Sequence, residues 1–149
     1  MPLQINSSAF EADQPIPEKH TGDGADVSPP LTWSSPPEDT AELALICDDP
    51  DAPTAEPWVH WVIYKIPADQ PGLPENVEPV HNPSEVPVAA QGVNSWSSGR
   101  TIGYRGPAPP PGHGTHHYHF TLYALDASLK VKPGLSKTVL LAALSGHVL

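Results

Sequence analysis

Four histidines, three glycines and four prolines fall within residues 106–120, which read GPAPPPGHGTHHYHF. Glycines let the backbone turn tightly and direct its N–H groups at an anion. Prolines reduce the conformational entropy that such a loop loses when it becomes ordered. His116 and Tyr118 are two residues apart in an expected strand, so their side chains leave the same face. Imidazole, phenol and backbone amide donors together predict a pocket for a phosphate or a carboxylate.

A second stretch, CDDPDAP at residues 47–53, offers carboxylates at fixed positions. Asp49 precedes Pro50, and a residue before proline is held in an extended conformation. The carboxylate of Asp49 is therefore expected at the end of a buried strand. An ordinary acidic turn remains the alternative, since Asp and Pro are common turn residues.

A third candidate is His60, which lies within the sequence WVHWVIY. One interpretation is a core histidine whose hydrogen bonds are satisfied internally. The other is a functional imidazole on a strand next to the one that ends at Asp49. Contact with Asp49 would then fix the imidazole tautomer and raise its affinity for protons.

The elements that must position these residues are short strands joined by stiff loops. The 21 prolines exclude a helical bundle, because proline breaks helix interiors and is confined to strand edges, bulges and turns. Strands are expected at 31–34, 41–47, 58–66 and 116–125, with an edge strand within 3–10 and Pro-rich loop sequence at 69–87. In the strand 58–66, alternation predicts one face with Trp58, His60, Val62 and Tyr64, and another with Val59, Trp61 and Ile63.

One helix is expected, at 136–148, with Ser136 as its N-cap. Its apolar stripe would consist of Val139, Leu140, Ala143 and Leu144. Strands separated by turns and followed by one late helix predict a mainly β protein, an antiparallel β-sandwich with a C-terminal helix and Pro-rich loops.

Composition narrows the functional classes. The chain has 149 residues, which suits a single domain spanning 1–149, and a formal net charge of −10. Seven scattered Lys and Arg residues form no basic face, which argues against nucleic-acid binding and against an anionic membrane surface. The sequence shows neither the pattern of a signal peptide nor that of a membrane span. We therefore expect a cytoplasmic location and no stable membrane insertion. Cys47 is the one cysteine, so no internal disulfide is possible.

The stretches DDPDAP, WVHWVIYKIPA and YRGPAPPPGHGTHHYHFTLYAL resemble the signature regions of the phosphatidylethanolamine-binding protein family, which includes the Raf kinase inhibitor proteins. The resemblance is closest to the bacterial and archaeal, Raf-kinase-inhibitor-like branch, and it extends from about Leu3 to Leu149. It implies a phosphatidylethanolamine-binding protein-like β-sandwich with a small surface pocket for anions such as phosphate, acetate or a phosphoethanolamine headgroup.

The resemblance also implies which residues form that pocket. Those that match the family's binding residues are Asp49, His60, His116 and Tyr118. The pocket wall is expected to include Pro53, Trp58, Tyr104, Gly106 and Pro107. The family often has cis peptide bonds in this proline-rich loop, which suggests one near Pro50 or Pro53.

The chain departs from the family in three places. His117 and His119 follow His116 where relatives have other residues, and we assign both to the opposite face, outside the pocket. The terminal segment with a tyrosine that bacterial relatives carry is missing. The longer C-terminal helix of the animal members is missing too. These losses predict a less covered pocket and an exposed strand edge or apolar patch, which a homodimer contact would cover.

The leading expectation is a binding protein without cofactor or metal, and not an enzyme. It would hold a small anion or phosphorylated ligand such as a phospholipid headgroup, and would act as an inhibitor or modulator of a kinase or protease. One alternative is a metal-dependent hydrolase that uses Asp49, Asp51, His60 and His116, which are suitable ligand types but lack a recognised spacing. Another is nucleophilic hydrolysis, for which no Gly-x-Ser-x-Gly motif exists and Cys47 is expected to be buried and inert. A protein-interaction module without a small ligand also stays open.

Overall fold

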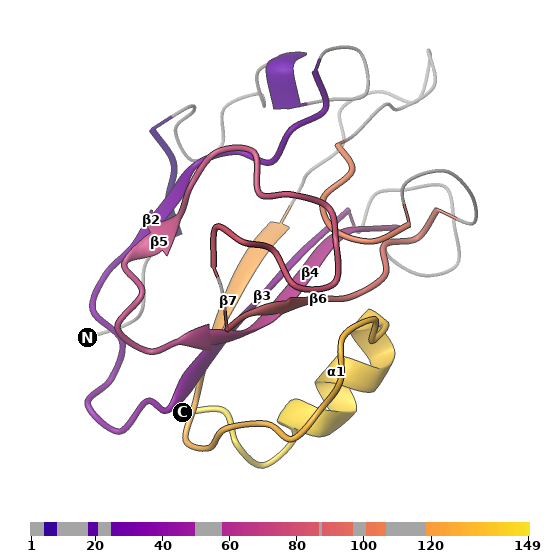
Figure 1. Ribbon diagram of the computed structural model, residues 1–149. Coiled ribbons are helices and arrows are strands. Elements are labelled where there is room, and N and C mark those ends of the chain that lie inside the picture. The colour runs from indigo at the N-terminus through magenta and orange to yellow at the C-terminus, as the bar shows by residue number, and fades with distance from the viewer. Residues whose placement is uncertain are drawn as a thin grey trace.

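Two antiparallel β-sheets and one helix make up the fold (Figure 1). The computed structural model describes residues 5–8, 18–20, 25–49, 58–86, 88–96, 101–106 and 119–149. The strands are β1 (Ile5–Asn6), β2 (Leu31–Trp33), β3 (Glu42–Asp49), β4 (Trp58–Pro67), β5 (Gly72–Leu73), β6 (Ala90–Gln91) and β7 (His119–Leu125). The helices are a 3-10 turn, η1 (Glu18–His20), and α1 (Lys137–Leu144). The larger sheet has the order β6-β4-β3-β7 and the smaller has the order β1-β2-β5, which confirms the predicted mainly β fold.

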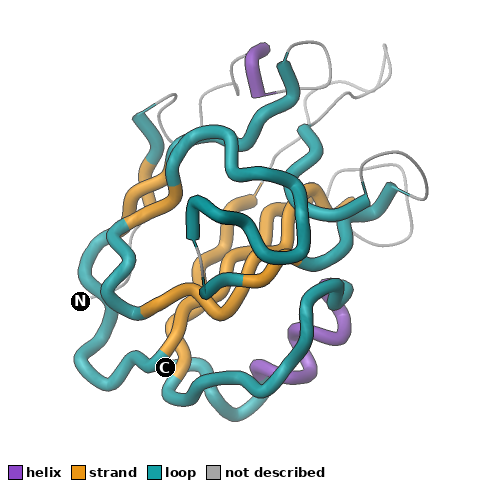
Figure 2. Tube along the Cα trace, in the orientation of Figure 1, coloured by secondary structure: helices purple, strands orange, loops and turns teal. Residues whose placement is uncertain are grey.

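The long strands β3 and β4 form where the sequence is richest in apolar, β-branched and aromatic residues, as predicted. β3 pairs antiparallel with β4 on one side and with β7 on the other. Nearly every residue of β3 is buried, because both faces of the large sheet are covered. One face packs against the small sheet and the other against α1, as Figure 1 and Figure 2 show.

The two faces of the large sheet carry two separate apolar clusters. The cluster between the sheets includes Leu43, Leu45, Trp61 and Ile63 from the large sheet, with Trp33 and Leu73 from the small one. The cluster under the helix includes Ala44, Ile46, Val62 and Tyr64, with Leu140 and Leu144 from α1. Each fully buried aliphatic side chain contributes roughly 1.5–3 kcal/mol.

Two irregularities in β4 change the predicted alternation. The register shifts between the pairs Cys47–Trp61 and Asp48–Val59, so His60 is an extra residue on β4. Because of this bulge, Val59 packs in the helix-side cluster with Val62 rather than on the face of Trp61. The prediction that Val59 and Trp61 share a face is therefore wrong. A second shift occurs near Lys65, whose φ is 56°.

The helix begins as predicted but ends earlier. The Ser136 hydroxyl caps α1 by accepting a hydrogen bond from the Val139 N–H at 3.2 Å. α1 ends at Leu144 rather than at residue 148, because Gly146 takes a φ of 84° and turns the chain. Leu140 and Leu144 are buried as expected, whereas Val139 is 51% exposed, so its assignment to the apolar stripe is wrong.

The last residues return along the edge of β7. Val148 forms an antiparallel bridge with Leu125, and the Leu149 N–H donates to the Ala124 carbonyl at 2.9 Å. Residues 148 and 149 thus pair with part of the outer edge of β7. Val148 and Leu149 are themselves half exposed.

Smaller elements fit the expected loops. β1 lies within the expected edge strand 3–10, and residues 69–86, the described part of the Pro-rich stretch, include the two-residue strand β5 and no other strand. Across the described ranges, no helix has both the length and the apolar character needed to cross a lipid bilayer.

Candidate functional site

Asp49 and His60 lie at the same end of the large sheet, on adjacent strands. Asp49 ends β3 and is paired with Trp58, the first residue of β4, and His60 follows in the bulge. Because Val59 packs under the helix, its neighbour Trp58 points to the other face of the sheet. The Trp96 ring contacts the rings of both Trp58 and His60, so the imidazole lies on the side of Trp58. Asp49 and His60 are each only 3% exposed. The pairing confirms that the strands carrying these two residues are neighbours.

Two adjacent carboxylates leave β3 toward opposite faces. Asp48 points toward α1, where its Oδ2 accepts a hydrogen bond from Lys137 Nζ. Strand alternation therefore directs Asp49 to the face of the small sheet. The Lys137–Asp48 ion pair is largely buried, so the helix-side carboxylate has its own cation. Of the two carboxylates, Asp49 has the larger effect on the pKa of His60.

The backbone of Arg105 fixes the orientation of His60. The Arg105 N–H donates to the His60 carbonyl at 3.0 Å, and His60 Nδ1 lies 2.9 Å from the Arg105 carbonyl oxygen. A carbonyl only accepts, so Nδ1 must carry the hydrogen. The Arg105 carbonyl thus sets the tautomer of His60. The sequence had suggested Asp49 for this role.

Burial decides the protonation state of His60. Burial lowers the pKa of the imidazole below its usual value, while the Arg105 carbonyl and then Asp49, Asp48 and Asp26 raise it. The carboxylates raise the pKa as predicted, but desolvation has the larger effect, so the net proton affinity of His60 is lowered. His60 is neutral at pH 7.

The segment 101–106 forms a braced wall beside these residues. Tyr104 is 2% exposed, and its hydroxyl donates to the His20 carbonyl at 2.5 Å. Its ring packs edge-on against Trp61 with centroids 5.7 Å apart. The Gly106 N–H donates to Asp26 Oδ1. Tyr104 is therefore a support of this wall, and its hydroxyl binds a backbone carbonyl.

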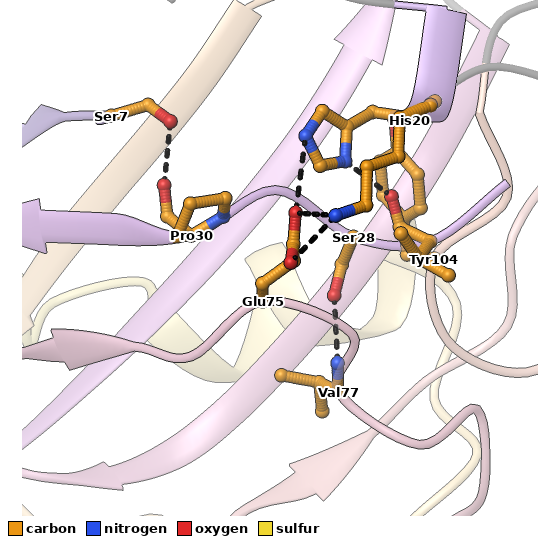
Figure 3. A network of polar contacts seen from close by, with 9 residues as sticks. Ser7, His20, Ser28, Pro30, Glu75, Val77 and Tyr104 are labelled. Atoms are coloured by element: carbon orange, nitrogen blue, oxygen red, sulfur yellow. Dashed lines mark hydrogen bonds and ion pairs between the residues drawn. The ribbon is translucent and has the colours of Figure 1, made fainter. Parts of the chain in front are cut away.

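A polar network ties the wall to two distant loops (Figure 3). His20 Nδ1 lies 2.9 Å from the Val27 carbonyl, and His20 Nε2 lies 3.7 Å from Glu75 Oε1. Lys19 Nζ lies 2.9 Å from the same Glu75 oxygen. The Val77 N–H donates to the Ser28 hydroxyl at 2.9 Å. The segments 19–20, 27–28, 75–77 and 104–106 are thus connected, although they are far apart in the sequence.

Sequence reasoning missed two residues near the site, Trp96 and Arg105. The Trp96 ring lies 5.4 Å from the His60 ring and 5.3 Å, edge-on, from the Trp58 ring. The Arg105 guanidinium carbon lies 4.8 Å from the centroid of the Trp96 ring. Both residues come from a stretch, 94–105, that has no strand periodicity. In the sequence NSWSSGRTIGYR, the aromatic Trp96 and the cation Arg105 come shortly before the Gly-Pro step at residues 106–107. This combination is the signal that could have identified them.

Several predicted site residues lie outside the described residues. These are Pro53, Pro107, His116 and Tyr118, together with Asp51 and the bonds preceding Pro50 and Pro53 that were expected to include a cis peptide. Within the described part, the structure brings together Asp49, Trp58 and His60 at the end of the large sheet. Tyr104 and Gly106 flank Arg105, whose backbone bonds to His60. His119, which we assigned outside the pocket, is exposed at the start of β7.

The alternatives from the sequence gain little support here. Among the residues that the structure describes, no group of three or more His, Cys, Asp or Glu side chains could hold a metal ion. Cys47 is buried, and burial, followed by the charges of Asp48 and Asp49, raises the pKa of its thiol well above the usual value. Such a thiol stays protonated at neutral pH and is a poor nucleophile.

A separate cavity of about 390 Å³ lies on the helix side of the large sheet. It is lined by Val59, Val93, Asn94, Ser95, Ser136, Lys137 and Thr138. Asp49 and His60 point to the other face, so this cavity is not the predicted pocket.

Comparisons with known proteins agree with this architecture. The sequence model described as "Phosphatidylethanolamine-binding protein" matches residues 6–149. The UPF0098 protein of Methanothermobacter thermautotrophicus is 46% identical over 147 residues, which cover 99% of this chain and 92% of that protein. A Mycobacterium tuberculosis protein named "Putative lipoprotein LppC" is 44% identical over 133 residues, covering 89% of this chain and 60% of its own length.

A solved structure has the same fold. The crystal structure of Escherichia coli YbcL, described as a new member of the mammalian PEBP family, aligns with a TM-score of 0.88 and 31% sequence identity. The alignment covers 99% of this chain and 92% of that chain.

Proposed function

The chain belongs to the phosphatidylethanolamine-binding protein family, and on that premise we propose that it binds a small anion, a phosphate or a phosphorylated headgroup, at Asp49 and His60. It acts by binding and not by catalysis. The observation that carries the proposal is that a carboxylate and an imidazole, both buried, lie on adjacent strands at one end of the large sheet, near enough for Asp49 to raise the pKa of His60. Buried polar groups at a sheet end beside a braced loop suit a small polar ligand.

The chemistry of His60 sets the form of the ligand that binds. With its Nδ1 hydrogen directed at the Arg105 carbonyl, a neutral His60 offers Nε2 as an acceptor. A singly protonated phosphate can donate its P–OH to this nitrogen. A protonated His60 would instead donate from Nε2, which strengthens anion binding at acidic pH.

The affinity for a bare anion is modest. Two or three charge-assisted hydrogen bonds contribute roughly 1.5–3 kcal/mol each, and the loss of freedom on binding offsets much of this. The net result is a dissociation constant on the order of millimolar to micromolar. A physiological ligand adds contacts beyond the anion, which is why the proposal extends to a larger phosphorylated partner such as a lipid headgroup or a kinase or protease surface.

Isothermal titration calorimetry with inorganic phosphate at pH 6.0 and 8.0 tests the proposal. We expect saturable binding by the wild type and at least about a tenfold loss in His60→Ala and in Asp49→Asn. His81→Ala removes an exposed imidazole and is the matched control, with unchanged affinity expected. Equal affinity in all four proteins, or no saturable binding by the wild type, would refute the proposal.

A further inference from the structure

Asp49 and His60, the two side chains of the proposed site, are both hydrogen-bond acceptors. His60 Nδ1 lies 2.9 Å from the Arg105 carbonyl oxygen, so Nδ1 carries the hydrogen of the neutral ring and Nε2 has a lone pair. An ionised carboxylate has no hydrogen, so Asp49 accepts and never donates. Its two oxygens accept several hydrogen bonds, so Asp49 can accept from a ligand in addition to its contacts within the protein.

The surroundings of His60 keep its ring in this acceptor form. Burial lowers the pKa of the imidazole, and the Arg105 carbonyl, Asp49, Asp48 and Asp26 oppose this only in part. The Arg105 N–H also donates to the His60 carbonyl at 3.0 Å, so one residue holds both the backbone and the ring of His60. At pH 8.0 the ring is therefore neutral, and its two nitrogens cannot exchange roles unless the bond to the Arg105 carbonyl breaks.

The two acceptors lie close together in a buried setting. Asp49 pairs with Trp58, two residues before His60 on β4, and it has the largest effect of any carboxylate on the pKa of His60. Asp49 and His60 are each 3% exposed. Hydrogen bonds are stronger in such surroundings than in water, and a polar group left without one costs more.

A pair of acceptors distinguishes anions by whether they carry a hydrogen. An oxyanion without a hydrogen offers only lone pairs to Asp49 and His60, and the negative charge of Asp49 repels it. An oxyanion with one hydroxyl group donates that hydrogen to one of the two acceptors. Two anions of equal charge are repelled alike, so the hydrogen decides which of them binds more tightly.

We propose that Asp49 and His60 make this site select hydrogen phosphate, HPO₄²⁻, over dianions that carry no hydrogen, such as sulfate and fully ionised phosphomonoesters. The inference rests on the proposed function, because it concerns the same site, and it names free inorganic phosphate as the small ligand. A phosphomonoester loses its last P–OH hydrogen above a pKa of about 6. Such an ester is therefore selected only in its singly charged form.

Calorimetry at pH 8.0 with inorganic phosphate, sulfate and methyl phosphate tests this inference. All three are mainly dianions at this pH, and hydrogen phosphate alone carries a hydrogen. Sulfate matches it in size, and methyl phosphate shares its phosphorus centre. We expect the wild type to bind phosphate at least about tenfold more tightly than either of the other anions. Equally tight binding of sulfate or of methyl phosphate would overturn the inference.

Two variants and a matched control assign the selection to its residues. Asp49→Asn and His60→Gln each replace an acceptor with an amide, which also donates, so the phosphate-to-sulfate ratio of binding constants should fall to about one to three. Asp48→Asn makes the same substitution at the neighbouring carboxylate, which pairs with Lys137 on the other face of the sheet. It changes the repulsion of both dianions equally, so the wild-type ratio should remain. A fall in Asp48→Asn as large as that in Asp49→Asn would refute the role of the acceptor pair.

The outcomes separate this inference from the proposed function. If the wild type binds phosphate and sulfate equally while Asp49→Asn and His60→Ala lose phosphate binding, the site stands and its selectivity for a hydrogen is refuted. If none of the three anions binds saturably, both fail. A wild-type ratio retained in Asp49→Asn and His60→Gln overturns the inference as well. Should one of these variants lose its fold by circular dichroism, the other decides, and the wild-type ratio needs no variant.

Discussion

His60 is a buried imidazole surrounded by carboxylates, and the balance between these two influences determines how it titrates. Desolvation lowers its pKa, while the Arg105 carbonyl, Asp49, Asp48 and Asp26 partly oppose this. The sequence could identify His60 and Asp49 because each lies at a distinctive place in a strongly patterned strand. It could not give the direction of the shift, which depends on how completely the neighbouring loops exclude water.

The first prediction concerns the titration of His60. NMR of the imidazole should give a pKa below about 6.5, the ordinary value for histidine. Because the folded pKa is lowered, the unfolded chain binds protons more readily, and stability falls as pH decreases from about 6.5 toward the folded pKa. His60→Asn should show a shallower decline in the free energy of unfolding over that window. A titration above 6.5 would contradict the account of burial.

Trp96 and Arg105 show what a single sequence conceals at this scale. Neither lies in a periodic segment, and their importance comes from contacts with His60, which is 36 and 45 positions earlier in the chain. Contacts between such distant residues exist only after the sheet has paired and the loops have closed on it.

At the scale of elements, the wall at 104–106 is held by contacts from loop residues as well as by its bonds to β4. Asp26 accepts a hydrogen bond from the Gly106 N–H and has a φ of 56°. Aspartate tolerates this left-handed conformation better than most residues. Tyr104 adds a second attachment through the His20 carbonyl.

The second prediction tests that attachment. Asp26→Ala removes the acceptor and places alanine in an unfavourable conformation, so we expect a loss of about 1–3 kcal/mol in the free energy of unfolding. Phosphate binding should weaken as the wall loosens. Asp26→Asn keeps an acceptor oxygen and the tolerance for positive φ, and should lose less than half as much. Urea unfolding and calorimetry measure the two effects, and equal losses in both variants would argue against this role.

The third prediction concerns Gln91, which links three elements. Its Oε1 accepts from the Trp61 indole N–H at 2.7 Å, and its Nε2 donates to the Glu78 and Val80 carbonyls at 2.7 and 2.8 Å. The side chain is fully buried. Gln91→Leu leaves these three partners unsatisfied, so we expect a loss of at least about 2 kcal/mol in urea unfolding.

Gln70→Leu serves as the comparison for Gln91→Leu. Gln70 is half-buried and donates to the Gly72 carbonyl at 2.9 Å. Its loss should be well under that of Gln91→Leu. A similar loss in both would mean that the buried network contributes no more than the single, half-buried hydrogen bond of Gln70.

At the scale of the whole molecule, the large sheet separates two environments. Strand β3 ends in two carboxylates: Asp48 points to the face covered by α1, and Asp49 points to the face of the candidate site. The sequence predicted the β-sandwich, its long strands and the capped start of α1 because apolar runs, prolines and the N-cap serine are local signals.

The remaining features could not be predicted locally. The bulge at His60, the early end of α1 and the return of Val148 along β7 all depend on pairing between distant segments. The bulge matters most for the site, because it takes Trp58 and His60 off the face of Val62 and Tyr64, where plain alternation would put them, and Trp58 pairs with Asp49.

The most direct test of the central claim is a ¹H–¹⁵N NMR titration of the labelled protein with inorganic phosphate. The account predicts saturable shift changes at the amides of His60, Arg105 and Gly106 and at the Trp96 indole, with little change at Lys130 and Lys132. Saturable changes confined to Lys137 and Thr138, beside the helix-side cavity, would place the anion on the wrong face of the sheet and contradict the account. Shifts that rise linearly without saturation would contradict it equally.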